Sequence, residues 1–320
     1  MALVIDAIGI GYSAMLHHQH QTLTALDGHD IHVQLWQPDG ECSHLIQVLH
    51  GLGEHADRYA RFAATAAERG YAVCVHNHRG HGGHGGVPGH FADADGWQKI
   101  IDDAEAVSNS IREQFAGTPV ILLGHSMGSY IAQAFAMHYG ARLSGLILSA
   151  STWPSRVQLL PLLVVAHIES WRLDARGKSP LLNQLGFGNF NKSFEPARTD
   201  LDWLSRDDAE VDKYVADPLC GGPYSCRLWR DLLGGLFRIS SDKALLRIPS
   251  DLPILITGGE SDPVGGDKGM TRLAMHYAQT SHQRLTVKIY AGGRHEMLNE
   301  INRDEVASDW LSWIGATRGI

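Results

Sequence analysis

The chain has 320 residues, a formal net charge of −8, and a composition that is 44% hydrophobic and 19% charged. This length can bury a large core, and the composition is that of a soluble globular protein rather than a disordered one. The negative charge and the lack of a basic run argue against a nucleic-acid-binding surface, because such a surface offsets phosphate charge with clustered Lys and Arg.

No targeting segment is apparent, so the sequence predicts a soluble, cytoplasmic protein. The first residues, MALVIDAIGIGY, lack the positive charges and the cleavage site of a secretory signal. The longest apolar run, at residues 159–168, contains a proline and is shorter than the roughly 20 residues that cross a bilayer. The four cysteines are too few and too scattered for a disulfide scaffold, although Cys220 and Cys226 are close enough in sequence to pair.

Strand and helix patterns alternate along the first half of the chain. Short β-rich runs lie at residues 31–37, 45–49, 72–76, 119–123 and 145–149, and helical patterns lie at 58–69, 97–115 and 128–139. Such alternation is typical of a mostly parallel sheet with helices on both faces. Before it, the HHQHQ stretch from residue 17 is polar, is expected to be exposed, and is only a weak indication of a metal site.

The alternation stops between residues 152 and 247. This segment contains four tryptophans, many leucines and a long loop at 186–200, which together predict an inserted, mainly helical cap. Alternation then resumes with strands at 253–257 and 285–290 and helices at 268–279 and 303–315. The predicted fold is therefore an α/β core in two parts, residues 1–151 and 248–320, interrupted by a cap at residues 152–247.

The most informative segment is Gly124-His125-Ser126-Met127-Gly128, which lies between an apolar strand and an apolar helix. In that helix Ile131, Ala134, Phe135 and His138 repeat at helical spacing. A serine on so tight a strand-to-helix turn needs small neighbours, because larger side chains would collide with the adjoining elements. The pattern predicts that Ser126 is a catalytic nucleophile; a structural serine in a tight turn is the alternative.

A serine nucleophile needs a histidine base and a carboxylate that orients the histidine. Asp262 and His295 each follow one of the last two predicted strands, so both lie at strand ends, where open α/β sheets form active sites. The sequence therefore predicts a triad of Ser126, Asp262 and His295. Other acids and histidines nearby in sequence are alternatives for the acid and the base: Glu260, Asp267, His276 and His282.

The oxyanion that forms during acyl transfer needs two backbone N–H donors. Met127, the residue after the nucleophile, supplies the first. The loop His50-Gly51-Leu52-Gly53 follows an early strand, and its glycines let the backbone approach a substrate. The amide of Leu52 is the expected second donor, and a plain glycine turn is the alternative.

Six motifs follow one another over residues 50–300: HGLGEHADRY, NHRGHGGHGG, GHFADADGW, GHSMGS, GGESDPVG and GGRHEMLNE. Together they resemble the monoacylglycerol lipase and lysophospholipase branch of the α/β-hydrolase fold, which also contains enzymes described as serine aminopeptidases. The resemblance implies an α/β-hydrolase core with an inserted cap. It also implies the same triad, Ser126, Asp262 and His295, and the same oxyanion donors, Leu52 and Met127.

The resemblance further implies that Glu54 and Arg58 line the polar end of the acyl site and hydrogen-bond the head group of the substrate. A capping carboxylate and a helix-start arginine are the alternative. Asn77 departs from the aspartate that relatives often have, which puts a local salt bridge in doubt. Four histidines in this region could suggest a metal site: His76, His78, His81 and His84. The resemblance implies instead that the loop is structural, and the expected chemistry needs no metal and no cofactor.

The expected function is hydrolysis of a small-molecule, single-chain acyl ester such as a monoacylglycerol or a lysophospholipid. Peptidase or amidase activity and acyl transfer are alternatives on the same triad, and a non-catalytic ligand-binding module is the alternative from another class. A peptidase would call for acidic cap residues near Ser126, and three are available: Asp207, Asp208 and Glu210. Six apolar cap residues form an acyl tunnel, a face for transient membrane or micelle contact, or ordinary core: Leu159, Leu160, Leu162, Leu163, Val164 and Val165.

Overall fold

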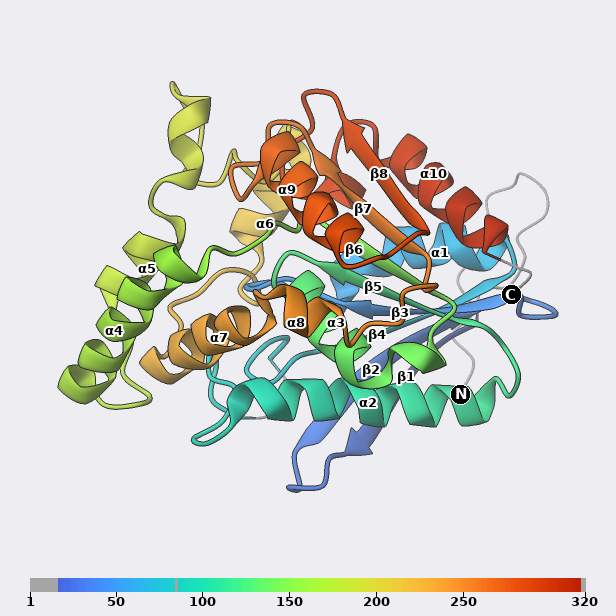
Figure 1. Cartoon of the computed structure of the whole chain (residues 1–320), viewed down its shortest axis with the longest axis horizontal. Helices are drawn as coiled ribbons and strands as arrows, with labels where there is room; N and C mark the ends of the chain where they lie inside the picture. The colour runs from blue at the N-terminus through green and yellow to red at the C-terminus, as the bar shows by residue number, and fades with distance from the viewer. Residues whose placement is uncertain (1–16, 84–85, 318–320) are drawn as a thin grey trace.

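A mostly parallel sheet of eight strands forms the centre of the protein in a computed structural model that describes residues 17–83 and 86–317 (Figure 1). The strands are β1 (His17–Thr24), β2 (Asp30–Gln37), β3 (His44–Leu49), β4 (Tyr71–His76), β5 (Val120–His125), β6 (Gly145–Ser149), β7 (Ile254–Gly259) and β8 (Leu285–Tyr290). Their order is β1-β2-β4-β3-β5-β6-β7-β8. Strand β2 runs antiparallel to both of its neighbours, and the other pairs are parallel. The α/β fold class predicted from the sequence is confirmed.

The central strands are buried on both faces, which explains their continuous apolar sequences. In β5, Ile121 and Leu123 face one hydrophobic cluster and Leu122 faces another, as the two-residue period of a strand requires. The two clusters are the cores on either side of the sheet. This packing leaves only the strand ends and the loops that follow them free for chemistry.

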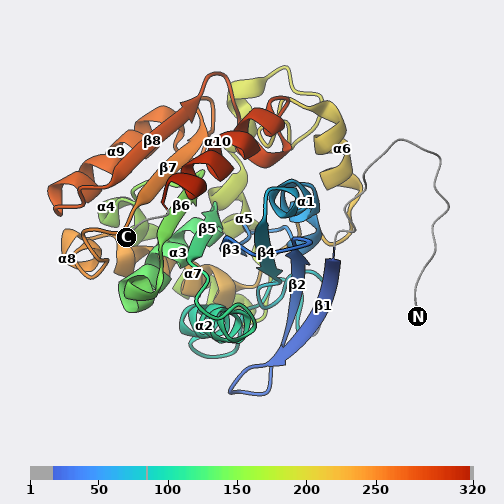
Figure 2. The ribbon, with the colours of Figure 1, turned by 90° about the vertical axis from the view of Figure 1, so that its right-hand side faces the viewer.

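Five helices cover the sheet: α1 (Ala60–Glu68), α2 (Gly96–Gln114), α3 (Met127–Tyr139), α9 (Gly266–Gln279) and α10 (Arg303–Ala316). Residues of α1 and α10 belong to the core on one face, and residues of α2, α3 and α9 belong to the core on the other. Figure 2 shows α1 and α10 on one side of the strands and α2 on the opposite side. Short 3-10 turns lie at η1 (Ala56–Tyr59), η2 (Gly140–Arg142) and η4 (Met297–Asn299).

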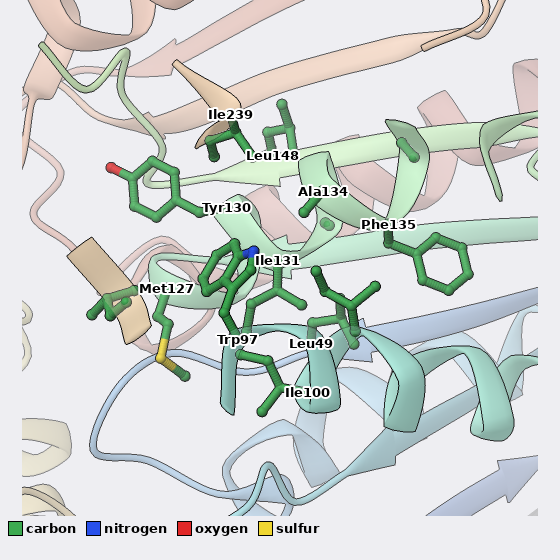
Figure 3. Packing of buried hydrophobic residues seen from close by; sticks show 14 of the residues in the cluster. Leu49, Trp97, Ile100, Met127, Tyr130, Ile131, Ala134, Phe135, Leu148 and Ile239 are labelled. Carbon is green, nitrogen blue, oxygen red and sulfur yellow. The ribbon is translucent and has the colours of Figure 1, made fainter. Parts of the chain in front are cut away.

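Helix α3 is buried between the sheet and its neighbours. Every residue from Met127 to Met137 is inaccessible to solvent or nearly so, whereas His138 near its end is exposed. In Figure 3 the side chain of Ile131 lies beside Trp97 and Ile100 of α2. A helix that is apolar all round belongs in a core. The element that follows Ser126 is therefore held rigidly.

The segment between β6 and β7, called the insert below, is mainly helical. It contains α4 (Arg156–Leu173), α5 (Pro180–Phe187), the 3-10 turn η3 (Phe190–Phe194), α6 (Asp208–Ala216), α7 (Cys226–Ile239) and α8 (Asp242–Leu245). Its β pairing is limited to a single bridge between Lys178 and Ser225 among the residues described. Figure 1 shows α4, α5 and α7 projecting beyond the sheet on the left.

Strand β1 was not expected from the sequence. Its burial pattern shows why, because His17 to His20 are all exposed and give no apolar alternation. The strand forms through backbone pairing with the whole of β2, and His18 stacks on Trp36 at a ring distance of 4.3 Å. The helix expected from residue 58 is also corrected, since it consists of η1 followed by α1.

None of the helices described over residues 17–83 and 86–317 is both long and apolar enough to cross a membrane. Cys220 and Cys226 are free thiols, so the pairing considered from the sequence is not formed. The MALVIDAIGIGY segment lies outside the described residues.

Candidate active site

Ser126 occupies the sharp turn between β5 and α3. Its backbone has φ 50° and ψ −119°, an unfavourable conformation that is held by a hydrogen bond from the Ser126 N–H to the carbonyl of Ser149 (2.9 Å). A Cβ atom at Gly128 would overlap the carbonyl oxygen of Leu49, and one at Gly124 would overlap the carbonyl of Gly128. Only glycine fits at these two positions, as the sequence pattern requires.

His295 and Asp262 meet in the loops that follow β8 and β7. The Nδ1 atom of His295 lies 2.9 Å from Oδ1 of Asp262, and both side chains are buried. The same carboxylate oxygen accepts a hydrogen bond from the N–H of Val264 at 2.9 Å, which fixes its orientation. The structure therefore brings two members of the expected triad into direct contact.

The other acids and histidines near these loops have different partners. Glu260 is exposed and accepts a hydrogen bond from the N–H of Gly292, and Asp267 is exposed at the start of α9. His276 stacks on Trp153 and contacts Asp242. His282 contacts Thr280 and the carbonyl of Tyr277. None of the four lines the cavity that contains Ser126 and His295.

Asp262 raises the pKa of His295. Burial alone would lower the pKa of the imidazole, because a charged ring loses hydration. The negative charge and hydrogen bond of Asp262 outweigh burial, with Glu296 adding to the effect, and the pKa of His295 is raised above its ordinary value. A neutral ring in this setting is a stronger base than a free imidazole.

The loop at residues 50–53 lies against Ser126. A Cβ atom built on Gly51 would be 3.3 Å from Cβ of Ser126 and 2.8 Å from Oε1 of Glu54. Leu52 lines the same cavity as Ser126 and His295. Met127 opens α3, and the first N–H groups of a helix have no intrahelical acceptor. The loop that contains Leu52 thus lies close to Ser126, and Met127 follows Ser126 directly in the chain.

Glu54, Arg58 and Glu296 form a buried cluster beside the serine. The guanidinium of Arg58 pairs with Glu296 and lies 3.4 Å from Oε2 of Glu54, and all three side chains are less than a tenth exposed. Glu54 also accepts hydrogen bonds from the N–H of Gly51 (2.5 Å) and the hydroxyl of Tyr59 (2.9 Å). Glu54 is thus not a helix cap, because its carboxylate is used within the site.

The pKa values of Glu54 and Glu296 are shifted in opposite directions. Burial alone would raise the pKa of Glu54, but His125, Arg58 and the N–H of Gly51 lower it to about 2. Burial raises the pKa of Glu296, and Arg58 offsets only part of this effect. Glu296 was not anticipated from the sequence. The signal for it was its position directly after His295, which places it at the same strand end.

A cavity of about 750 Å³ connects these groups with the insert. Ser126, His295, Glu54 and Glu296 line its floor, but Arg58 does not and borders only a small pocket behind them. The insert contributes mostly aromatic and apolar side chains, including Pro180, Phe187, Phe190, Trp203, Leu204, Tyr214 and Tyr224. Such a mixture of an apolar wall and a few polar groups is typical of a small-molecule site.

The apolar residues of α4 do not form a tunnel into this cavity. None of the six residues considered from the sequence lines it. Leu159 is buried, whereas Leu160 and Val164 are about half exposed. The residues thus divide between core packing and an outer face, and the lining of the cavity comes instead from α5 and the loops around η3.

The acidic residues at the start of α6 are engaged elsewhere. Asp207 caps the helix by accepting a hydrogen bond from the N–H of Ala209 and pairs with Arg303. Glu210 pairs with Arg61. Asp207, Asp208 and Glu210 are absent from the lining of the cavity, so these three residues do not supply the acidic recognition that a peptidase would call for.

Three of the histidines considered from the sequence lie at and just after the end of β4. His76, His78 and His81 are buried, and burial lowers the pKa of each, to about 4 for His76 and His81. They do not bring three ligand atoms within 4.8 Å of one another, and His84 lies outside the described residues. Asn77 accepts a hydrogen bond from the N–H of Ala56 at 2.8 Å.

Arg79 retains its salt bridges in spite of the asparagine at position 77. Its guanidinium pairs with Asp103 at 2.6 Å and with Asp27 at 2.7 Å. The doubt that Asn77 raised about a local salt bridge is therefore resolved, because two other carboxylates supply the partners.

The parallel sheet, the serine on the turn after β5 and the His–Asp pair at the same sheet edge define a serine hydrolase of the α/β-hydrolase fold. The chain belongs to the family described as "Serine aminopeptidase, S33", which it matches over residues 40–302. The resemblance stated from the sequence motifs is confirmed.

Named relatives cover almost the whole chain. Monoglyceride lipase from Homo sapiens is 30% identical over 309 residues, which are 93% of this chain and 91% of that protein. Monoacylglycerol lipase from Mycolicibacterium smegmatis is 29% identical over 88% of this chain and 91% of its own length. Among solved structures, a highly thermostable carboxyl esterase from Bacillus coagulans in complex with glycerol has a TM-score of 0.86 and 27% identity, and covers 94% of this chain and 98% of that one.

Proposed function

We propose that the protein is a carboxylic-ester hydrolase that cleaves single-chain acyl esters, monoacylglycerols or lysophospholipids, through an acyl-enzyme on Ser126. The observation that carries this proposal is the hydrogen-bonded pair of His295 and Asp262, with His295 lining the same cavity as Ser126. The names of the relatives support it, since they include monoglyceride lipase, monoacylglycerol lipase and "Probable lysophospholipase L2".

The proposed reaction assigns one role to each residue. The hydroxyl oxygen of Ser126 attacks the acyl carbonyl while His295 takes its proton, and Asp262 holds the ring in the productive tautomer. The N–H groups of Leu52 and Met127 stabilise the oxyanion. His295 then returns the proton to the departing alcohol, and water releases the fatty acid from Ser126 in a second cycle of the same steps. No step needs a metal or a cofactor.

The insert acts as the cap in this proposal. Residues 152–247 form it, and residues 1–151 and 248–320 form the hydrolase core. The aromatic side chains of α5 and η3 face the cavity and offer a binding surface for an acyl chain. All three triad residues belong to the core. The cap lines the cavity, so we expect it to determine which substrates bind.

The polar floor of the cavity suits a neutral leaving group. Its charged lining consists of the carboxylates Glu54, Asp200 and Glu296 besides two histidines, while Arg58 is held behind by its ion pairs. Carboxylates accept hydrogen bonds from hydroxyl groups and repel a phosphate. Arg58 would then not contact the head group, and would instead hold Glu54 and Glu296 in position to bind it. The glycerol in the solved carboxyl esterase is consistent with this reading.

A panel of substrates with one acyl chain tests the proposal. We expect fatty-acid release from a monoacylglycerol to exceed release from the matched lysophosphatidate by at least 100-fold in kcat/KM, which corresponds to about 3 kcal/mol. A p-nitrophenyl ester of the same fatty acid has no lipid head group, so its hydrolysis measures acyl transfer to Ser126 without any contribution from head-group binding. Turnover of p-nitrophenyl esters alone, with no glycerol ester or lysophospholipid cleaved, would contradict the assignment.

Glu296→Gln is expected to narrow the preference for monoacylglycerol over lysophosphatidate by roughly tenfold, because it removes one carboxylate from the cavity lining and one of the two ion pairs that offset the charge of Arg58. Glu68→Gln makes the same change of charge on the exposed face of α1 and should leave the ratio unchanged. An equal ratio in the wild type and Glu296→Gln would show that the cavity floor does not set the head-group preference.

A cytoplasmic location is part of the proposal, and cell fractionation tests it. Contact with lipid surfaces through α4 is a further part. One face of α4 exposes Val157, Leu160, Val164, Ile168 and Trp171, and the exposed fraction is 83% for Val157 and 87% for Trp171. These positions recur every three or four residues, so they form one stripe.

Removal of this stripe should weaken binding to vesicles. Trp171→Asp combined with Ile168→Asp is expected to reduce cosedimentation with phosphatidylcholine vesicles at least fivefold, because two charges replace the exposed apolar side chains. Hydrolysis of a soluble p-nitrophenyl ester should persist. Leu26→Asp is the control, because Leu26 is fully exposed in the turn between β1 and β2. Equal loss in both variants would contradict a specific role of α4.

A further inference from the structure

His55, Asp217 and Cys220 form a group of three metal-ligand side chains outside the triad. One ring nitrogen of His55, one carboxylate oxygen of Asp217 and Sγ of Cys220 all lie within 4.8 Å of one another. His55 and Asp217 are in contact at 2.9 Å. This is the one such group that the described residues contain. His55 comes from the loop before η1, and the other two come from the loop between α6 and α7.

The insert loop holds Asp217 and Cys220 in fixed positions. Oδ1 of Asp217 accepts a hydrogen bond from the N–H of Leu219 at 2.8 Å, which leaves Oδ2 directed at His55. The N–H of Cys220 donates to the carbonyl of Asp217 at 3.0 Å, so the two side chains project from one tight turn. The sequence Asp-Pro-Leu-Cys thus presents a carboxylate and a thiol together.

The core loop holds His55 in a similarly defined orientation. The ring is buried, and its second nitrogen, Nδ1, lies 3.5 Å from Oδ2 of Asp57. A carboxylate behind a histidine fixes its orientation and increases its basicity, and this arrangement recurs at metal sites. Nε2 of His55 faces Asp217, and a metal ion between them would replace the proton that this nitrogen now shares with the carboxylate.

The donor set selects the metal. Imidazole, carboxylate and thiolate are the three ligand types of protein zinc sites, whereas magnesium and calcium prefer oxygen atoms alone. Ligand atoms around tetrahedral zinc are about 3.5 Å apart, so the present separations need only small side-chain movements. Cysteine binds zinc as the thiolate, so zinc binding would release the proton of the Cys220 thiol.

We propose that His55, Asp217 and Cys220 bind Zn²⁺, with a water molecule in the fourth position, and that the ion fastens the insert to the core. The loop that carries Cys220 continues into Gly221 and Gly222, which line the catalytic cavity. The N–H of Gly221 donates to the carbonyl of Gly53 at 2.7 Å, next to Leu52. Zinc would therefore stabilise the contact between the cap and the loop beside Ser126.

The site is independent of the proposed hydrolysis, and it is tested by binding and stability. We expect a zinc concentration 100 times the dissociation constant to raise the Tm of chelator-treated protein by about 5 °C, because the metal binds the folded state. Cobalt(II) in place of zinc should give an absorption band from thiolate-to-cobalt charge transfer.

Cys220→Ser should abolish the cobalt band and weaken zinc binding by at least tenfold. Cys42→Ser is the matched control, since Cys42 is a partly buried cysteine outside the site, and this variant should retain both signals. Cys220→Ala serves as a second variant if the serine variant folds poorly. The proposal is overturned if cobalt gives no thiolate band, or if zinc shifts the Tm of Cys220→Ser as much as that of the wild type.

Discussion

Replacement of Ser126 by alanine is expected to reduce kcat for ester hydrolysis by roughly 10⁴- to 10⁶-fold. The reason is chemical, because no other hydroxyl is described at the apex of the turn between β5 and α3. The fold should survive the change, since Ser126 is held by its backbone N–H and carbonyl rather than by its side chain. Steady-state kinetics with a p-nitrophenyl ester, together with the Tm, measure both effects.

Ser261→Ala is the matched control for this experiment. Ser261 is an exposed serine directly before Asp262, so it lies in the same region without reaching the cavity lining. This variant should keep kcat within a few fold of the wild type. Wild-type turnover by Ser126→Ala would exclude Ser126 as the nucleophile.

Asp262→Asn is expected to reduce kcat by about 10⁴-fold. The carboxylate accepts a hydrogen bond from the N–H at Nδ1 of His295, which leaves Nε2 unprotonated and free to act as the base. An asparagine side chain can donate its amide hydrogen to Nδ1 instead, and this stabilises the wrong tautomer of the ring. The loss of negative charge also lowers the pKa of His295 and weakens it as a base.

Two other acids provide the comparison for Asp262. Glu260→Gln and Asp267→Asn remove the carboxylates that the sequence left as alternatives, and both residues are exposed. Each variant should retain most of the wild-type activity, with the loss confined to Asp262→Asn. A loss of 10³-fold or more in Glu260→Gln or Asp267→Asn would transfer the role of the acid to that residue.

The sequence predicted the core of this protein well because strong local constraints act there. Strand β5 had to be apolar on both faces, and Gly124 and Gly128 had to be glycine because backbone atoms lie where their Cβ atoms would be. The chain order of strands and loops then brought Asp262 and His295 to one sheet edge. These features depend on backbone geometry, which restricts the residue types allowed at each position and can therefore be recognised in the sequence.

The remaining features depend on tertiary packing and could not be predicted in this way. Strand β1 has an exposed, polar surface and forms only because β2 offers a free edge. The position of Arg58 behind Glu54 and Glu296 depends on its ion pair with Glu296, which lies 238 residues further along the chain. The apolar residues of α4 divide between core packing and an outer face because α5 and the η3 loops form the cavity wall.

The central claim is that Ser126 is the nucleophile of an ester hydrolase, and covalent labelling tests it most directly. The protein is treated with a fluorophosphonate, and the modified peptide is identified by mass spectrometry, with ester hydrolysis followed in the same sample. We expect one label per chain on Ser126, with activity lost in proportion to labelling and no label in Ser126→Ala. Labelling of another residue, or full ester hydrolysis after complete labelling of Ser126, would contradict the claim.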